Sequence, residues 1–232
     1  MSRVKTLFVA LFALALVAAA FATTSALALE LPDVHILAGE TYPVTGEGAV
    51  KGEDLFVLET ELGEKILARE IKIKIELAEL TSLGLATVDL TEAVEKVLGG
   101  PKCNTVGDAA GTVLINGEYH IIDLSTSPLT IAFLLLFPEL TLECGKVKVK
   151  VRGPLIAAIT KVTSGTDVTQ FGIAAKCAAG KGKQELKEYL NDEGAKTKGA
   201  ATANFGLGFE TACVSTGVEV VINTTKMIDF LF

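Results

Sequence analysis

The stretch Ile71-Lys72-Ile73-Lys74-Ile75-Glu76-Leu77 alternates apolar and charged residues without interruption. Successive side chains of a β-strand point to opposite faces, so a period of two predicts a strand with one buried and one solvated face. Residues 146–151 repeat the pattern with Lys and Val. Strands of this kind belong to antiparallel sheets, and both stretches therefore predict an antiparallel β fold.

Further β-type runs extend this prediction over most of the chain. Residues 129–137 are apolar apart from Thr130 and stop at Pro138, which predicts a central strand buried on both faces. Residues 155–162 predict another strand after the turn residues 152–154. We expect an all-β, mainly antiparallel sandwich or irregular barrel with an N-terminal signal helix and at most one or two short helices.

Three segments carry local turn or helix signals. Asn116-Gly117 lies between two apolar runs and predicts a type I′ hairpin turn that would set Ile115 opposite Glu118. Residues 91–98 begin with a Thr that can cap a helix and are followed by Gly99-Gly100, so a short helix is expected there. Residues 184–203 contain helix formers, but the Asn-Asp-Glu-Gly turn within them favours a hairpin.

The N-terminus has the order of residues typical of a secretory signal. Arg3 and Lys5 precede an uncharged apolar run, and the small-residue pattern Ala26-Leu27-Ala28 follows it. We expect residues 1–28 to be a cleaved signal peptide. Residues 29–232 are then expected to form a single all-β domain, with a possible sub-division near residues 99–101.

Charge and cysteine content restrict the function further. Without residues 1–28, 19 Lys and Arg remain against 28 Asp and Glu, a net charge of −9. Nucleic acids and anionic membranes attract basic surfaces, so neither is expected as a partner, and the partner remains unknown. The four cysteines of an exported chain predict two disulfides, with the pairing open among three possibilities. The disulfide candidates are Cys103, Cys144, Cys177 and Cys213.

The chain lacks three common sequence signatures of catalysis or cofactor binding. It has no Gly-x-Ser-x-Gly, His-Glu-x-x-His or Gly-x-Gly-x-x-Gly motif. Residues 180–184 look like a phosphate loop but lack its spacing, and they predict a solvated turn. No catalytic residue, cofactor or metal site is expected, and the chain is not expected to be an enzyme.

Two weaker alternatives involve acidic residues. Glu118 and His120 share one strand face and would supply two ligands for a cation, but no third ligand is specified. A glycosidase needs only two carboxylates at the right separation, and four acids lie on segments expected to be neighbours. They are Glu118, Asp123, Glu139 and Glu143.

The C-terminal residues suggest a further alternative. From Val218 to Phe232, apolar residues recur on one parity and the chain ends on Phe, as the last strand of an outer-membrane barrel does. Such barrels also carry aromatic girdles, whereas this chain has no Trp and only 6% aromatic residues. The simpler prediction is a last strand with one face in the core.

One resemblance supports export. Residues 103–111, with Gly117-Glu118-Tyr119-His120, Leu142-Glu143-Cys144-Gly145 and residues 176–184, resemble a group of uncharacterised secreted proteins of soil actinobacteria. The resemblance covers about the last 130 residues and implies export and an all-β fold without a reaction centre. We expect an exported, non-catalytic structural or binding module, secreted or at the cell surface. The alternatives are an outer-membrane-type barrel and a carbohydrate-active enzyme.

Overall fold

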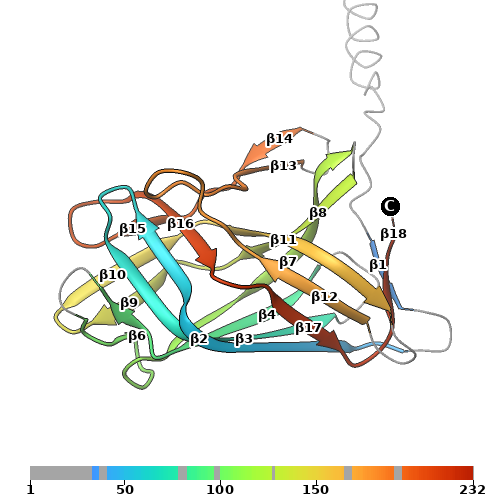
Figure 1. Ribbon diagram of the computed structural model, residues 1–232, viewed down its shortest axis with the longest axis horizontal. Coiled ribbons are helices and arrows are strands. Elements are labelled where there is room, and N and C mark those ends of the chain that lie inside the picture. Colours follow the sequence, from blue (N-terminus) through green and yellow to red (C-terminus); the bar gives the residue numbers. More distant parts are fainter. Residues whose placement is uncertain are drawn as a thin grey trace, which may run out of the picture.

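The computed structural model describes residues 33–36, 41–77, 83–96, 100–126, 129–164, 169–190 and 195–231 (Figure 1). These residues form strands, turns and bends and no helix, which confirms the all-β prediction. No helix capable of crossing a membrane was found among them. The expected signal peptide, residues 1–28, lies outside the described residues.

A long hairpin organises the molecule. Strands β2 (Val44–Thr60) and β3 (Lys65–Leu77) pair along nearly their whole length, from Val44 opposite Leu77 to Glu59 opposite Lys65. The alternating residues of β3 behave as predicted, because Ile71, Ile73, Ile75 and Leu77 are buried and the residues between them are exposed. The pairing shifts between Lys51 and Phe56, and β2 changes one of its neighbours at this bulge.

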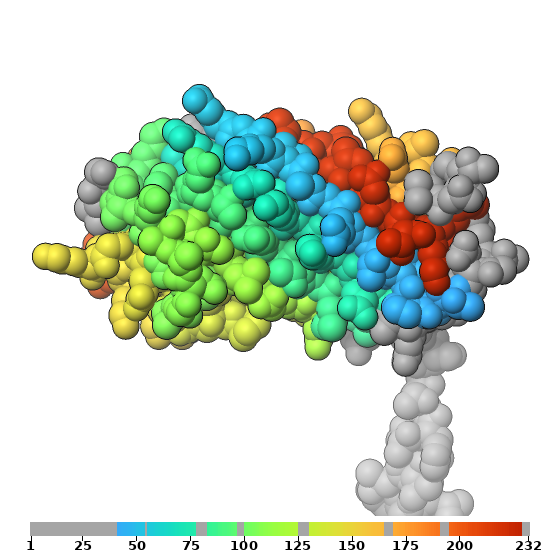
Figure 2. All heavy atoms as spheres, turned by 90° about the horizontal axis from the view of Figure 1, so that it is seen from below, coloured from blue at the N-terminus to red at the C-terminus, as the bar shows by residue number. Residues whose placement is uncertain are grey.

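The half of the hairpin before the bulge closes an eight-stranded antiparallel barrel, which we call the large barrel. Each strand pairs with the next in the order β2, β3, β4, β7, β8, β11, β12, β17, and β17 returns to β2. Figure 2 shows this closure from outside, with β2 in blue between the teal atoms of β3 and the red atoms of β17. Of the two predicted architectures, sandwich and irregular barrel, the structure has the barrel. The bounds are β4 (Leu83–Thr91), β7 (Val113–Thr126), β8 (Leu129–Leu136), β11 (Leu155–Ser164), β12 (Thr169–Ala174) and β17 (Val220–Thr224).

Apolar side chains pack inside the large barrel. The ring of Tyr119 stacks on Phe133 with 4.8 Å between ring centres, and both are buried. Gly84 faces Tyr119 across the β4–β7 pair, and a Cβ at Gly84 would overlap that ring. β8 is buried on both faces, as predicted, since Phe133 and Leu135 belong to the main core while Leu134 belongs to a second cluster.

The other half of the hairpin belongs to a second, smaller circle of paired strands, the small ring. From β2 the pairing runs through β16, β15, β10, β9 and β6, and β5 pairs with the start of β3. A bridge between Val94 and Lys102 links β5 to the β6 segment and completes the circle. The bounds are β5 (Val94–Glu95), β6 (Cys103–Thr105), β9 (Leu140–Cys144), β10 (Val147–Arg152), β15 (Thr202–Asn204) and β16 (Glu210–Thr216).

Two further strand pairs lie outside these circles. β13 (Glu188–Leu190) and β14 (Lys196–Lys198) form the hairpin that was favoured over a helix, with Tyr189 opposite Thr197. Leu186 and Tyr189 cover an outer apolar cluster of Ile122, Ala132, Leu134 and Ile156. β1 (Asp33–Ile36) pairs with β18 (Ile228–Leu231) near the ends of the chain.

Two local predictions were wrong. Asn116-Gly117 is no turn, because β7 continues through it, and Ile115 pairs with Val88 instead of Glu118. Residues 91–96 form no helix, since Thr91 ends β4 and Val94–Glu95 form β5. In both cases pairing with neighbouring strands overrides the local preference of the sequence.

Candidate functional site

A hollow of about 540 Å³ lies on the outside of the molecule, and we call it the Gly117 hollow. It lies where β4 and β7 meet the connection from β8 to β9. Its lining residues are Leu85, Ala86, Thr87, Asn116, Gly117, Glu118, Leu136, Phe137 and Pro138.

Strand register explains why these side chains meet. Leu85 pairs with Glu118, and Glu118 pairs with Leu136, so the three form a row across three strands. Beside this row, the Thr87 hydroxyl donates to Asn116 Oδ1 over 2.9 Å. The hollow is therefore set by the register of β4, β7 and β8 and not by a flexible loop.

Gly117 has a specific role in this arrangement. A Cβ at this position would overlap the backbone carbonyl oxygen of Leu136, because the chain leaving β8 passes directly against β7. Glycine inside a strand commonly marks such a close backbone approach. The residue read from the sequence as a turn former is thus needed for packing between strands.

The hollow combines an apolar lining with an acidic rim. Leu85 is 60% exposed and Leu136 is 37% exposed, which is high for large apolar side chains. Glu118 is also exposed and forms no ion pair with another described residue. Such a surface suits burial of an apolar group next to a cation.

The structure places both candidate cation ligands on β7, without a third among the described residues. Glu118 is exposed and His120 half-buried on β7, and each pairs with a leucine of β4. No group of three or more His, Cys, Asp or Glu side chains that could hold a metal occurs in the part of the chain that the structure describes.

The four candidate carboxylates are also dispersed. Asp123 is buried, and burial raises the pKa of its carboxyl group. Hydrogen bonds from Lys150 and Arg152 lower the pKa of Glu139, whose carboxylate also forms ion pairs with both cations. Glu143 pairs with Lys148 over 3.7 Å. No pair of these acids flanks the hollow as glycoside hydrolysis would require.

The cysteines form two disulfides, as predicted, and the structure decides the pairing. Cys103 of β6 bonds to Cys144 directly opposite on β9, and Cys177 bonds to Cys213 of β16. The first bridge belongs to the small ring, and the second joins the ring to residues 176–184, a segment that we call its cover. Each joins a buried strand cysteine to a neighbouring segment.

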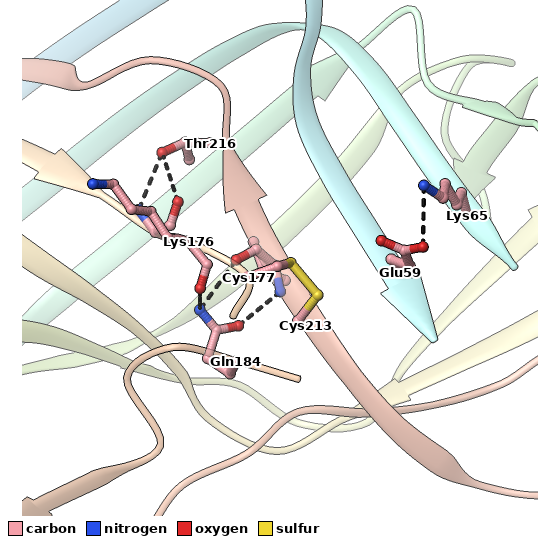
Figure 3. Close-up of a disulfide and its surroundings, with 9 residues drawn as sticks. Glu59, Lys65, Lys176, Cys177, Gln184, Cys213 and Thr216 are labelled. Atoms are coloured by element: carbon pink, nitrogen blue, oxygen red, sulfur yellow. Dashed lines mark hydrogen bonds and ion pairs between the residues drawn. A yellow bond between two sulfur atoms is a disulfide. The ribbon is translucent and has the colours of Figure 1, made fainter. Parts of the chain in front are cut away.

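The segment beside the second disulfide corrects a prediction (Figure 3). Residues 180–183 do turn, but Gln184 is buried and not solvated. Its side-chain Nε2 donates to Lys176 O and Val214 O over 2.9 and 3.1 Å, and its Oε1 accepts from Val214 N over 2.7 Å. Gln184 thus fastens the covering loop to β16.

Sequence reasoning missed a buried acid in the small ring. Glu95 is 1% exposed and pairs with Ile66 of β3. Burial raises the pKa of its carboxyl group, and the nearby Glu64 adds to the effect. The only signal in the sequence was the segment misread as helical, where a Glu at this position would have been solvated.

Comparisons with protein-family models, with curated proteins and with solved structures found no match to this chain.

Proposed function

We propose that this chain is an exported, non-catalytic module that acts through its outer surface as a structural or binding component, secreted or at the cell surface. The observation that carries the proposal is the pair of disulfides, Cys103–Cys144 and Cys177–Cys213. Disulfides persist in oxidising compartments and are rare in reducing ones. The signal-like residues 1–28 support the same conclusion.

The geometry supports binding over catalysis. Among the described residues, packed side chains such as Tyr119, Phe133 and Ile121 fill the interior of the large barrel. The Gly117 hollow has one carboxylate, an amide and a hydroxyl but no nucleophile held by a base. Its apolar lining suits recognition of another surface.

The two alternatives have weaker support. A carbohydrate-active enzyme would need a pair of converging carboxylates. Glu139 and Glu143 instead form ion pairs with Lys150 and Lys148, respectively. An outer-membrane barrel needs an apolar outer band, whereas Lys72 and Lys74 are exposed on the outer face of β3. Neither alternative function assigns a role to the Gly117 hollow.

Export is tested by expression with the native N-terminus, fractionation of the culture and N-terminal sequencing. We expect a soluble protein in the supernatant that begins at Leu29 and contains no titratable thiol in the folded state. Material that retains Met1, or that fractionates with membranes, would contradict the proposal.

Absence of catalysis is tested on a panel of polysaccharides with purified exported protein. We expect no hydrolysis above the level of a Glu118→Gln variant prepared in the same way. Hydrolysis by the wild type that this variant loses would establish an enzyme and overturn the non-catalytic assignment.

A further inference from the structure

The small ring is closed by its shortest strand. β5 has two residues, and they pair with Ile66 and Leu67 of β3. On the other side of β5, a single bridge from Val94 to Lys102 leads to β6. We call β5 and its pairings on both sides the β5 seam.

Few bonds hold the β5 seam together. The backbone N–H groups of Glu95, Lys96 and Cys103 donate to carbonyl oxygens of the facing segments over 3.0, 3.2 and 2.9 Å. The disulfide from Cys103 to Cys144 ties β6 to β9, on the far side of β6 from the seam. β6 is therefore fixed covalently to its outer neighbour, whereas β5 is attached to β3 by backbone pairing alone.

Glu95 places a carboxyl group inside this seam. Its side chain is 1% exposed, and its Oε2 has no hydrogen-bond partner in the described part of the chain. Residues directly opposite each other in an antiparallel pair share one face, so Glu95 points to the same side as Ile66 of the main core. The carboxyl group thus lies in an apolar interior, where its ionised form is costly.

A second acid lies on the same face. Glu64 precedes Ile66 by two residues and is therefore a diagonal neighbour of Glu95 across the strand pair. The hydroxyl group of the buried Thr60 donates to Glu64 Oε2 over 2.8 Å. Burial, and after it the Glu64 carboxylate, raise the pKa of the Glu95 carboxyl group.

The cations beside the seam belong to other surroundings. Lys65 forms an ion pair with Glu59 over 3.1 Å (Figure 3). Lys96 and Lys102 are exposed, whereas Glu95 is buried. An ionised Glu95 would therefore face Glu64 without a compensating positive charge inside the ring.

We propose that the β5 seam is closed while the Glu95 carboxyl group is protonated and opens when this group is ionised, so that the small ring responds to pH. An ionised carboxylate needs water, and separation of β5 from β3 admits it while breaking few bonds. β6 stays with β9 through the disulfide. Opening uncovers apolar side chains of the ring interior, such as Phe56 and Ile66. The inference goes beyond the proposed function, because it concerns a conformational change of the module.

The direction of the response follows from proton linkage. The closed seam holds the Glu95 proton more tightly than the open seam, in which the carboxyl group is solvated. Closure is therefore strongest below the ordinary carboxyl pKa of about 4, and its equilibrium constant falls about tenfold per pH unit up to the raised value. Above that value the extent of opening is constant.

The test measures hydrogen exchange of single amides by NMR between about pH 4 and pH 8, on folded protein with both disulfides formed. The reporters are the amides of Glu95, Lys96 and Cys103, and the amides of β4 and β7 are the reference. After correction for the pH dependence of intrinsic exchange, we expect the protection of the reporters to fall at least about tenfold relative to the reference.

Three variants assign the effect to its cause. Glu95→Gln cannot ionise, so the relative protection of its reporters should stay constant with pH. Glu64→Gln removes the repelling charge and should show a smaller fall than the wild type. Asp123→Asn removes a buried acid of the large barrel, and this matched control should show the full fall at the reporters.

Relative protection that stays constant with pH in the wild type overturns the proposal. So does a Glu95→Gln variant that retains the fall, a Glu64→Gln variant with a fall as large as that of the wild type, or a control that loses it. Circular dichroism checks that each variant is folded. If Glu95→Gln does not fold, the wild type and Glu64→Gln still decide the outcome.

Discussion

The large barrel and the small ring share the β2–β3 hairpin and one hydrophobic cluster, but they are held together differently. Apart from the hairpin, the large barrel is built from strands of five to 14 residues and contains no disulfide. The strands of the small ring have two to seven residues, and both bridges lie in it or on its cover.

The difference shows how strand length and covalent links compensate. A long strand gains ladder hydrogen bonds and buried side chains that offset its lost conformational entropy. A strand of three residues, such as β6 or β15, gains few of either. Disulfides restrict the unfolded chain and so stabilise the region where non-covalent contacts are fewest.

The largest expected effect separates the two regions directly. Replacing Cys177 and Cys213 by Ser opens a bridge with a sequence separation of 36 residues. The chain-entropy model predicts a loss of about 4 kcal/mol in the free energy of unfolding. Hydrogen exchange should rise first in β15 and β16, while β4 and β7 remain protected. Equal loss of protection in β4 and β7 would show that the two regions unfold as one unit.

A substitution in the large barrel should act through packing alone. Gly117→Ala places a methyl group against the carbonyl oxygen of Leu136, and overpacking of this kind costs roughly 2 to 3 kcal/mol. Asn116→Ala, which removes only the exposed hydrogen bond to Thr87, is the control and should cost less than about 1 kcal/mol. Urea denaturation measures both. Equal stability of Gly117→Ala and the wild type would refute the close approach of β8.

A smaller effect is expected where a side chain fastens the cover of the small ring. Gln184→Ala removes three hydrogen bonds and leaves the buried backbone groups of Val214 without partners. We expect a loss of roughly 1 to 2 kcal/mol in the free energy of unfolding. The control is Lys183→Ala at the exposed neighbour. Thermal unfolding should show no difference between the control and the wild type.

The smallest expected effect is on the pH dependence of stability, and it concerns one buried acid from each region. Burial raises the pKa values of Glu95 in the small ring and Asp123 in the large barrel, so the folded state holds both protons more tightly than the unfolded chain. The resulting stabilisation is complete below the ordinary carboxyl pKa of about 4 and is lost as pH rises through the raised values.

Glu95→Gln and Asp123→Asn should therefore each reduce the loss of stability between about pH 4 and pH 8. Urea midpoints over this range provide the measurement. A variant whose midpoint falls as steeply with pH as that of the wild type would show that its carboxyl group is not the one responsible.

Local pattern predicted some elements well and others not at all. The alternation in residues 71–77 specifies both the strand and its buried face, because every side chain repeats the same choice. Asn116-Gly117 was misleading because a turn signal is only two residues long, and β4 and β8 pair with β7 on both sides of it. The Gly117 hollow could not be predicted, since it depends on the register of three strands.

By itself the sequence determined the all-β class, the strands β3, β8 and β10, the β13–β14 hairpin and the presence of two disulfides. These follow from the period of side-chain burial and from an even number of cysteines, both of which are properties of short segments or of composition. Only the tertiary structure decided the barrel closure, the cysteine pairing and the role of Gly117. Each depends on which distant strands become neighbours, as Cys103 and Cys144 do across β6 and β9. Such contacts are selected by the packing of the whole core and not by any one stretch of the chain.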